Sequence, residues 1–86
     1  MKIVIVGTTK QVRTGLQSHL TIQGHDVEAF DTGRQALVHL GSHGADLVLI
    51  DHTLSDMRPA TVATHLRQWA TEAPILVLKG GNRFVH

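Results

Sequence analysis

The residues with the clearest chemical potential in this chain stand directly after short apolar runs. Asp51 offers a carboxylate, the segment Gly7–Lys10 offers hydroxyls and backbone N–H groups, and Lys79 offers an ammonium. If the runs are neighbouring parallel strands, these groups meet at the carboxyl ends of the strands, where open α/β sheets place their ligands. We expect the Lys79 ammonium to approach Asp51 and to lower the pKa of its carboxyl group. The alternative is a solvated lysine at the end of a strand.

The segment Gly7–Lys10 has two interpretations. At a turn from a strand into a helix, its N–H groups, its threonine hydroxyls and the helix dipole favour a bound anion. The segment is short, however, and it lacks the residue spacing of a phosphate-binding loop. A helix cap made by Thr8 or Thr9 is the simpler interpretation.

Seven histidines raise the question of a metal site. His39 and His43 are four residues apart, but Gly41 between them is expected at a helix end. His52 is adjacent to Asp51, and adjacent residues at a strand exit point apart. Because the chain has no cysteine, a thiolate site and a disulfide are excluded. We therefore interpret the histidines as scattered surface residues, and we expect no cofactor and no enzymatic activity.

The apolar runs and their separation predict an α/β fold. Runs rich in β-branched residues and leucine alternate with segments whose apolar residues recur at helical spacing. This order indicates a parallel sheet with right-handed crossovers. The expected strands are 3–6, 27–30, 47–50 and 75–78, and the helices between them carry Val12, Leu16 and Leu20, then Ala36, Leu37 and Leu40, then Val62 and Leu66. Residues 1–79 are expected to form one domain, and residues 80–86 a tail or a short extra strand.

Polar and conformationally special residues mark the helix ends. Thr9 and Thr32 are expected to cap the first two helices, and Pro59 is expected to open the third because its missing N–H costs nothing there. Gly24 is expected to end the first helix, and Gly41 with Gly44 to close the second.

The composition narrows the classes of function. The chain has 86 residues, a net charge of +1 and 42% hydrophobic residues, which suits one small globular domain. No basic stripe is present, and the aromatic residues are few, so binding to nucleic acid or to an anionic membrane surface is not expected. No apolar run is long enough to span a membrane or to form a signal peptide, so we expect a cytoplasmic location.

Several motifs in register resemble the response-regulator receiver family. The stretch Asp46–Met57 is similar to the family's buried strand, phosphoacceptor aspartate and Leu-Pro-Asp-Met loop. The segments Gly24–Val27, Thr32–Leu37 and Pro74–Leu78 resemble its entry to strand two, its opening of helix two and its strand four. The resemblance covers residues 2 to 79. It implies a flavodoxin-like, CheY-like sheet of order 2-1-3-4 and places Asp51 at the phosphoacceptor position.

Departures from the family pattern concern the phosphorylation site. The resemblance implies two acidic residues after strand one, where this chain has Gly7 and Thr8, and a loop carbonyl at Thr53. These groups hold Mg²⁺, a hard ion that needs oxygen ligands, so its binding is expected to be lost or weak. The hydroxyl residue that ends strand four in the family is Lys79 here. The chain therefore resembles a degenerate receiver.

The family's helix four, strand five and helix five have no counterpart in these residues, so the resemblance is to a truncated receiver. We expect strand four to be a sheet edge and the helix-one face of strands three and four to be bare. Such an apolar surface favours association. The expected interface residues are Ile75, Leu76, Val77, Leu78, Phe84 and Val85. The expected partner is a second copy, as a homodimer or a swapped dimer, or another protein domain.

Three functions follow from these observations. The first is a receiver-like signalling module that acts by protein–protein interaction or self-association without phosphorylation. The second is residual phosphoacceptor chemistry at Asp51 in a two-component phosphorelay. The third is a sensor of an anion or small ligand at Gly7–Lys10.

Overall fold

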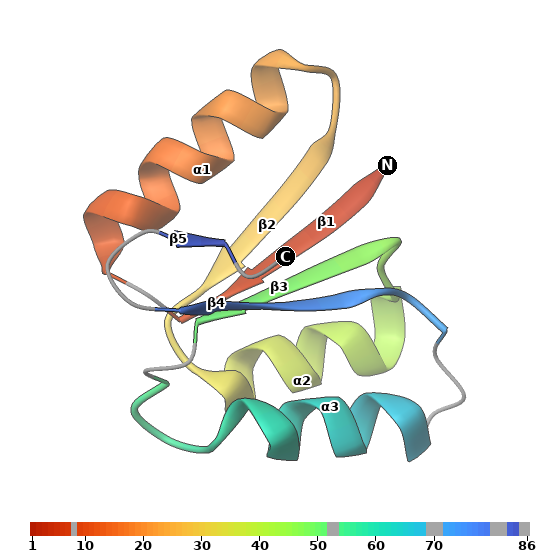
Figure 1. Cartoon of the computed structure of the whole chain (residues 1–86). Helices are drawn as coiled ribbons and strands as arrows, with labels where there is room; N and C mark the ends of the chain where they lie inside the picture. The colour runs from red at the N-terminus through yellow and green to blue at the C-terminus, as the bar shows by residue number, and fades with distance from the viewer. Residues whose placement is uncertain (8, 52–53, 69–71, 80–82, 85–86) are drawn as a thin grey trace.

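The computed structural model describes residues 1–7, 9–51, 54–68, 72–79 and 83–84, and of residues 78–79 and 83–84 it describes the backbone only. Strands and helices alternate along the chain (Figure 1). The elements are β1 (Lys2–Val6), α1 (Lys10–Ile22), β2 (Asp26–Phe30), α2 (Gly33–His43), β3 (Leu47–Asp51), α3 (Pro59–Gln68), β4 (Ile75–Lys79) and β5 (Arg83–Phe84).

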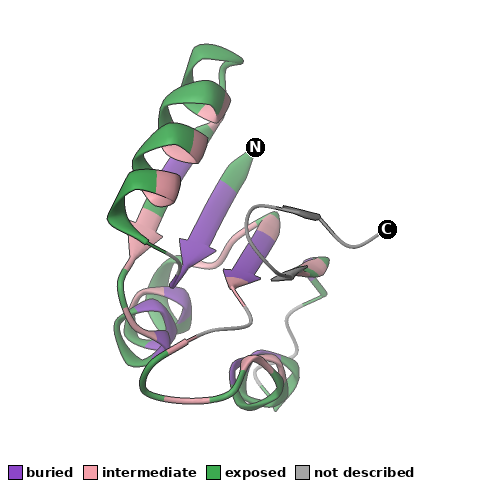
Figure 2. Ribbon diagram, turned by 60° about the vertical axis from the view of Figure 1, so that its left-hand side comes forward, coloured by how far each residue is buried: buried purple, intermediate pink, exposed green. Residues whose placement is uncertain are grey.

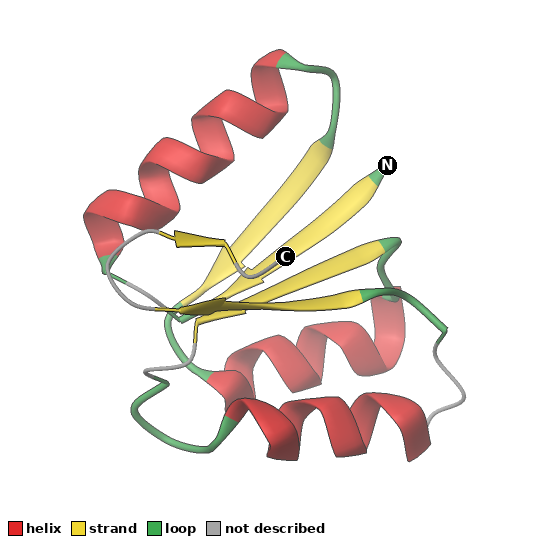
Figure 3. Cartoon of the chain, viewed as in Figure 1, coloured by secondary structure: helices red, strands yellow, loops and turns green. Residues whose placement is uncertain are grey.

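The strands form one sheet of order β2-β1-β3-β4-β5 (Figure 3). The first four are parallel, which confirms the predicted order 2-1-3-4. β5 pairs antiparallel with the end of β4, with Phe84 opposite Leu78 and Arg83 opposite Lys79. The prediction that β4 is the sheet edge is therefore wrong at its carboxyl end, because the chain turns back there and pairs with itself.

The helices lie in two layers, with α1 on one face of the sheet and α2 and α3 on the other (Figure 1). Alternate residues of β1 serve these two faces. Val4 and Val6 pack with Leu37, Leu40, Val62 and Leu66 of α2 and α3, whereas Ile3 and Ile5 pack with Leu16 and Leu20 of α1. The core thus lies on both sides of the central strands, and Figure 2 shows buried residues on these strands and on the helix surfaces that face them.

Side chains cap the first two helices as expected. The hydroxyls of Thr9 and Thr32 accept hydrogen bonds from the backbone N–H groups of Val12 and Gln35. α2, however, does not close at Gly41 but continues to His43, where the N–H of Gly44 donates to the carbonyl of Leu40. The buried Leu40 holds this last turn against the core, and this packing outweighs the low helix propensity of glycine.

The helix-one face of β3 and β4 is less bare than expected. Leu49 is only 4% exposed and packs in the same cluster as Ile3 and Ile5, so the prediction was wrong for β3. In β4, Leu76 is 43% exposed, and Ile75 and Val77 are half-buried. Of the predicted interface residues, Leu78 and Phe84 are described by their backbone alone, and Val85 lies outside the described residues.

Candidate functional site

The carboxyl ends of β1 and β3 meet as the sequence predicted. Asp51 is the last residue of β3, and Gly7 directly follows β1. A Cβ atom built on Gly7 would lie 3.4 Å from the Cβ of Asp51, so the two positions are direct neighbours. The backbone of Lys79 ends β4 one residue beyond the partner of Asp51, which is Leu78. The Lys79 side chain, Thr8 and Thr53 lie outside what the structure describes, so the proximity of Lys79 to Asp51 stays a prediction.

A side chain at position 7 would strain the backbone and displace a neighbouring side chain. Gly7 has a φ of +81°, a region that L-residues with a Cβ rarely adopt. A Cβ there would also lie 2.6 Å from the Cδ2 methyl of Leu54. Leu54 belongs to the loop after β3 and packs against the core of α2 and α3. An apolar methyl group therefore fills the space that a side chain at position 7 would need.

The backbone of Gly7 is held on both sides. Its N–H donates to the carbonyl of Phe30 at 2.8 Å, and its carbonyl accepts from Nη1 of Arg13 at 3.3 Å. The same guanidinium forms an ion pair with Asp31, and its side chain is only 15% exposed. Arg13 thus joins the first turn of α1 to the ends of β1 and β2, and it places a positive charge beside Gly7.

The contacts of Leu54 and Arg13 with Gly7 did not follow from the sequence. Leu54 was visible only as a motif residue, and nothing in the spacing placed its side chain over Gly7. Arg13 follows Gly7 by six residues, and it is the first arginine of α1. The signal that could have found it is a basic residue in the first turn of a helix that follows a strand.

The loop after β3 is fastened to the start of α2 by Asp56. One carboxylate oxygen accepts from the N–H of Gly33 at 2.9 Å, and the other accepts from the N–H of Arg34 at 3.0 Å. Desolvation raises the pKa of Asp56, but hydrogen bonds from the backbone N–H groups of Arg34, Gly33 and Asp56 and the charge of Arg34 outweigh it. The pKa of Asp56 therefore lies below its ordinary value. We call this contact the Asp56 clamp.

Met57 completes the Asp56 clamp by packing on a glycine. A Cβ on Gly33 would lie 2.7 Å from the Cγ and Sδ atoms of Met57 and 3.2 Å from Cγ2 of Val62. The Thr-Gly opening of α2 and the Asp-Met pair of the loop are therefore two halves of one contact, although 23 residues separate Gly33 from Asp56.

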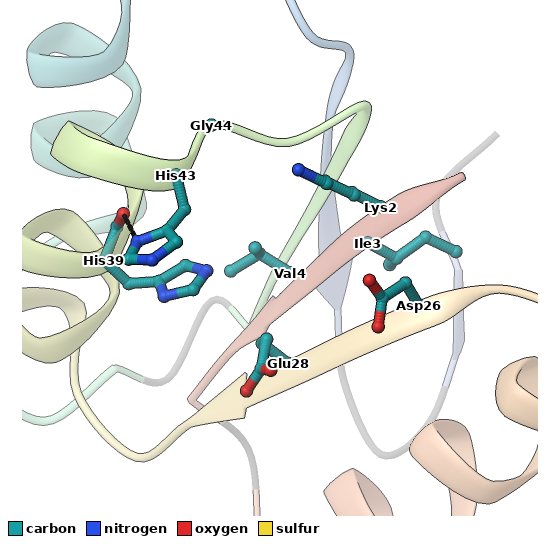
Figure 4. A pocket seen from close by; sticks show the side chains of 8 residues that line it. All are labelled: Lys2, Ile3, Val4, Asp26, Glu28, His39, His43 and Gly44. Carbon is teal, nitrogen blue, oxygen red and sulfur yellow. Dashed lines mark hydrogen bonds between the residues drawn. The ribbon is translucent and has the colours of Figure 1, made fainter.

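A small pocket lies at the opposite end of the strands (Figure 4). It has a volume of about 130 Å³ and is lined by Lys2, Ile3, Val4, Asp26, Glu28, His39, His43 and Gly44. His39 and His43 are not scattered but stacked, with ring centroids 4.4 Å apart, and Nδ1 of His43 lies 3.2 Å from the carbonyl of His39. Within the described ranges, no three His, Asp or Glu side chains come together as metal ligands. None of the described helices is long and apolar enough to cross a membrane.

A family model and the relatives of known sequence agree on one family of proteins. The model of the response regulator receiver domain matches residues 3–83. Response regulator MprA of Mycolicibacterium vanbaalenii is 32% identical over 78 residues, which are 91% of this chain and 34% of that protein. The virulence transcriptional regulatory protein PhoP of Salmonella typhimurium is 28% identical over 91% of this chain and 35% of its own length. The chain thus spans about a third of the length of these relatives.

Solved structures have the same fold. The chemotaxis response regulator CheY4 of Vibrio cholerae superposes with a TM-score of 0.87 at 23% identity, over 94% of this chain and 69% of that one. The N-terminal domain of a response regulator/sensory box/GGDEF protein from Carboxydothermus hydrogenoformans has a TM-score of 0.85 at 28% identity, over 96% and 67%.

The closed position at Gly7 gives a first prediction. Gly7→Ala should lower the free energy of unfolding by about 1–3 kcal/mol, because the alanine Cβ meets Leu54 and the backbone is strained. In a Leu54→Ala background the loss should be smaller, since the clash is gone and only the strain remains. Urea denaturation of the wild type, both single variants and the double variant measures this coupling. Additive losses would contradict the contact between Leu54 and position 7.

The Asp56 clamp gives a second prediction, which depends on pH. Because the pKa of Asp56 is lowered in the folded state, its contribution is present above the unfolded pKa and is lost as the pH falls through the folded pKa. Asp56→Ala should therefore cost about 1 kcal/mol at pH 7, a typical value for a helix cap. The difference from the wild type should shrink below a pH of about 4. Asp26→Asn, which changes an exposed carboxylate on β2, serves as the control, and an equal loss in both variants would refute the clamp.

Proposed function

This chain belongs to the response regulator receiver domain family, and from that premise we propose that it acts through protein–protein interaction without phosphorylation. The observation that carries the proposal is the closed position at Gly7. The family resemblance implies an acidic side chain at that position. Here the position is a glycine, and its left-handed backbone and the neighbouring methyl group of Leu54 disfavour any side chain.

The physical consequence concerns Mg²⁺. This ion requires an octahedron of oxygen ligands, and carboxylate charge offsets the cost of removing its water. A leucine methyl supplies no ligand, and it excludes water from the space that it fills. A phosphoryl group on Asp51 would place further negative charge at the end of β3, where the metal normally neutralises it. Loss of the metal site therefore disfavours phosphorylation at Asp51.

The geometry of the turn favours interaction over sensing of an anion. The Thr9 hydroxyl accepts from the N–H of Val12 and so serves as the helix cap. The N–H of Gly7 donates to the carbonyl of Phe30. Two N–H donors near this turn, those of Gly7 and Val12, are therefore already engaged within the fold and are not available to an anion.

A titration with Mg²⁺ and beryllium fluoride, which mimics a phosphoryl group, tests this proposal. We expect no shift of amide NMR signals near Asp51 up to about 10 mM Mg²⁺, because the site lacks the carboxylate charge that binds the ion. Incubation with acetyl phosphate should add no phosphoryl mass. Asp51→Asn is the matched control.

Two outcomes would overturn the proposal. Mg²⁺-dependent shifts that disappear in Asp51→Asn would establish a phosphoacceptor. Shifts at Thr9 and Lys10 on addition of phosphate without metal would establish a ligand sensor instead.

The exposed part of β4 generates a prediction about self-association. β5 pairs only with residues 78 and 79, so no described strand lies along the outer side of Ile75–Val77. Leu76 is 43% exposed there, and an apolar, uncharged strand edge favours pairing with another chain. Light scattering at micromolar concentration should show a dimer, and Leu76→Lys should shift it toward monomer.

Ile22→Lys is the control for this experiment, because Ile22 is 85% exposed on α1, away from β4. A wild-type chain that stays a 9.4 kDa monomer at all these concentrations would contradict self-association. The proposed protein–protein interaction would then be with a different protein domain and not with a second copy.

A further inference from the structure

The two helices that share one face of the sheet leave a groove on their outer surface. It is lined by Arg34, Leu37, Val38, Gly41, Met57 and His65 and has a volume of about 420 Å³. The residues from α2 recur at positions 34, 38 and 41, which form one stripe of that helix. We call this surface the α2–α3 groove. Figure 1 shows the two helices side by side.

The floor of the α2–α3 groove is apolar and accessible. Val38 is 73% exposed, which is unusual for a large apolar side chain on a helix of a small domain. Met57 is half-buried, and Leu37 is buried at 9% exposure. Gly41 adds no side chain to the stripe. The groove therefore offers an apolar, solvent-accessible surface on which side chains of a partner can pack.

The rim of the groove carries one guanidinium, that of Arg34 in the first turn of α2, and the imidazole of His65 on α3. Neither α2 nor α3 contains an Asp or a Glu. The carboxylate of Asp56 interacts with the charge of Arg34 and accepts hydrogen bonds from two backbone N–H groups. Nδ1 of His65 lies 2.9 Å from the carbonyl of Thr61 and donates to it, so Nε2 of the neutral ring is an acceptor for an N–H or O–H group of a partner.

We propose that the α2–α3 groove binds an acidic amphipathic segment of a partner protein. Its apolar side chains enter the groove between the helices, as in other complexes where a helix lies in a groove. Its carboxylates face the guanidinium of Arg34. The inference rests on the proposed function only in that the module acts by binding a protein, and it does not depend on the state of Asp51.

The charges of the groove disfavour the other occupants. A second copy bound symmetrically through the same groove would place two Arg34 guanidinium groups in one interface, with no carboxylate of α2 or α3 to pair with them. A nucleic acid or an anionic membrane requires more cations than the one guanidinium of this rim, and no Phe, Tyr or Trp lines the groove. An acidic segment with apolar side chains matches both the floor and the rim.

A titration with a designed peptide tests this inference on the whole 86-residue chain. The peptide has about 15 residues, with leucine at helical spacing on one face and glutamate on the flanks. Shifts of amide NMR signals should map to the α2–α3 groove. Arg34→Glu and Val38→Glu should each weaken binding by at least about tenfold, the equivalent of 1.4 kcal/mol. Ile22→Glu, which changes an exposed apolar residue on α1, should leave the affinity unchanged.

Two sets of controls separate the effect of the peptide's charge from a loss of the fold in the variants. A peptide with glutamine in place of glutamate should bind at least about fivefold more weakly, and added salt should weaken the acidic peptide more than the neutral one. Circular dichroism of each variant confirms that it remains folded. A folded variant that loses binding then reports on the groove itself.

Several results would overturn the inference. These are equal binding of the neutral peptide, shifts that map to α1 or β4, and no binding of the acidic peptide at millimolar concentration. Self-association that Val38→Glu abolishes would also overturn it, because a second copy would then be the occupant. None of these results depends on the Mg²⁺ and beryllium fluoride titration, so failure of this inference and failure of the proposed function are distinguishable.

Discussion

Gly7 lies where the carboxyl ends of β1 and β3 meet, and the residues around it pack against its bare backbone. Gly7 adopts a left-handed backbone, and Leu54 closes over it from the loop after β3. Arg13 donates to the Gly7 carbonyl and forms an ion pair with Asp31. These two contacts connect the first turn of α1 to the ends of β1 and β2. Leu54 and the Arg13 guanidinium thus connect the ends of β1, β2 and β3.

Much of the fold was predictable from the sequence because it depends on local patterns. Short β-branched runs separated by helical spacing gave the parallel order, and Thr9, Thr32 and Pro59 gave the helix starts. The errors arose where tertiary packing overrides local preference. Gly41 lies within α2 because Leu40 is buried beside it, and the end of β4 is covered because the chain folds back on it.

The candidate site was predictable only in part, for a related reason. The neighbourhood of Gly7 and Asp51 follows from strand order, because the carboxyl ends of adjacent parallel strands must meet. That Leu54 fills the space at position 7 does not follow, since a side chain's direction depends on the loop that carries it. Likewise, the contact of Asp56 with Gly33 joins residues far apart in the sequence, and neither residue type predicts which residue it contacts.

The Asp56 clamp and the α2–α3 groove share two residues, Arg34 and Met57. Arg34 supplies an N–H to Asp56 and its side chain to the groove, while Met57 packs on Gly33 and also lines the groove. The loop that follows Asp51 is therefore one wall of the groove. Any event that moves this loop changes the shape of the groove, and by thermodynamic reciprocity an occupant of the groove stabilises one conformation of the loop. A partner that binds the groove would therefore act, through Asp56 and Met57, on the segment that follows Asp51.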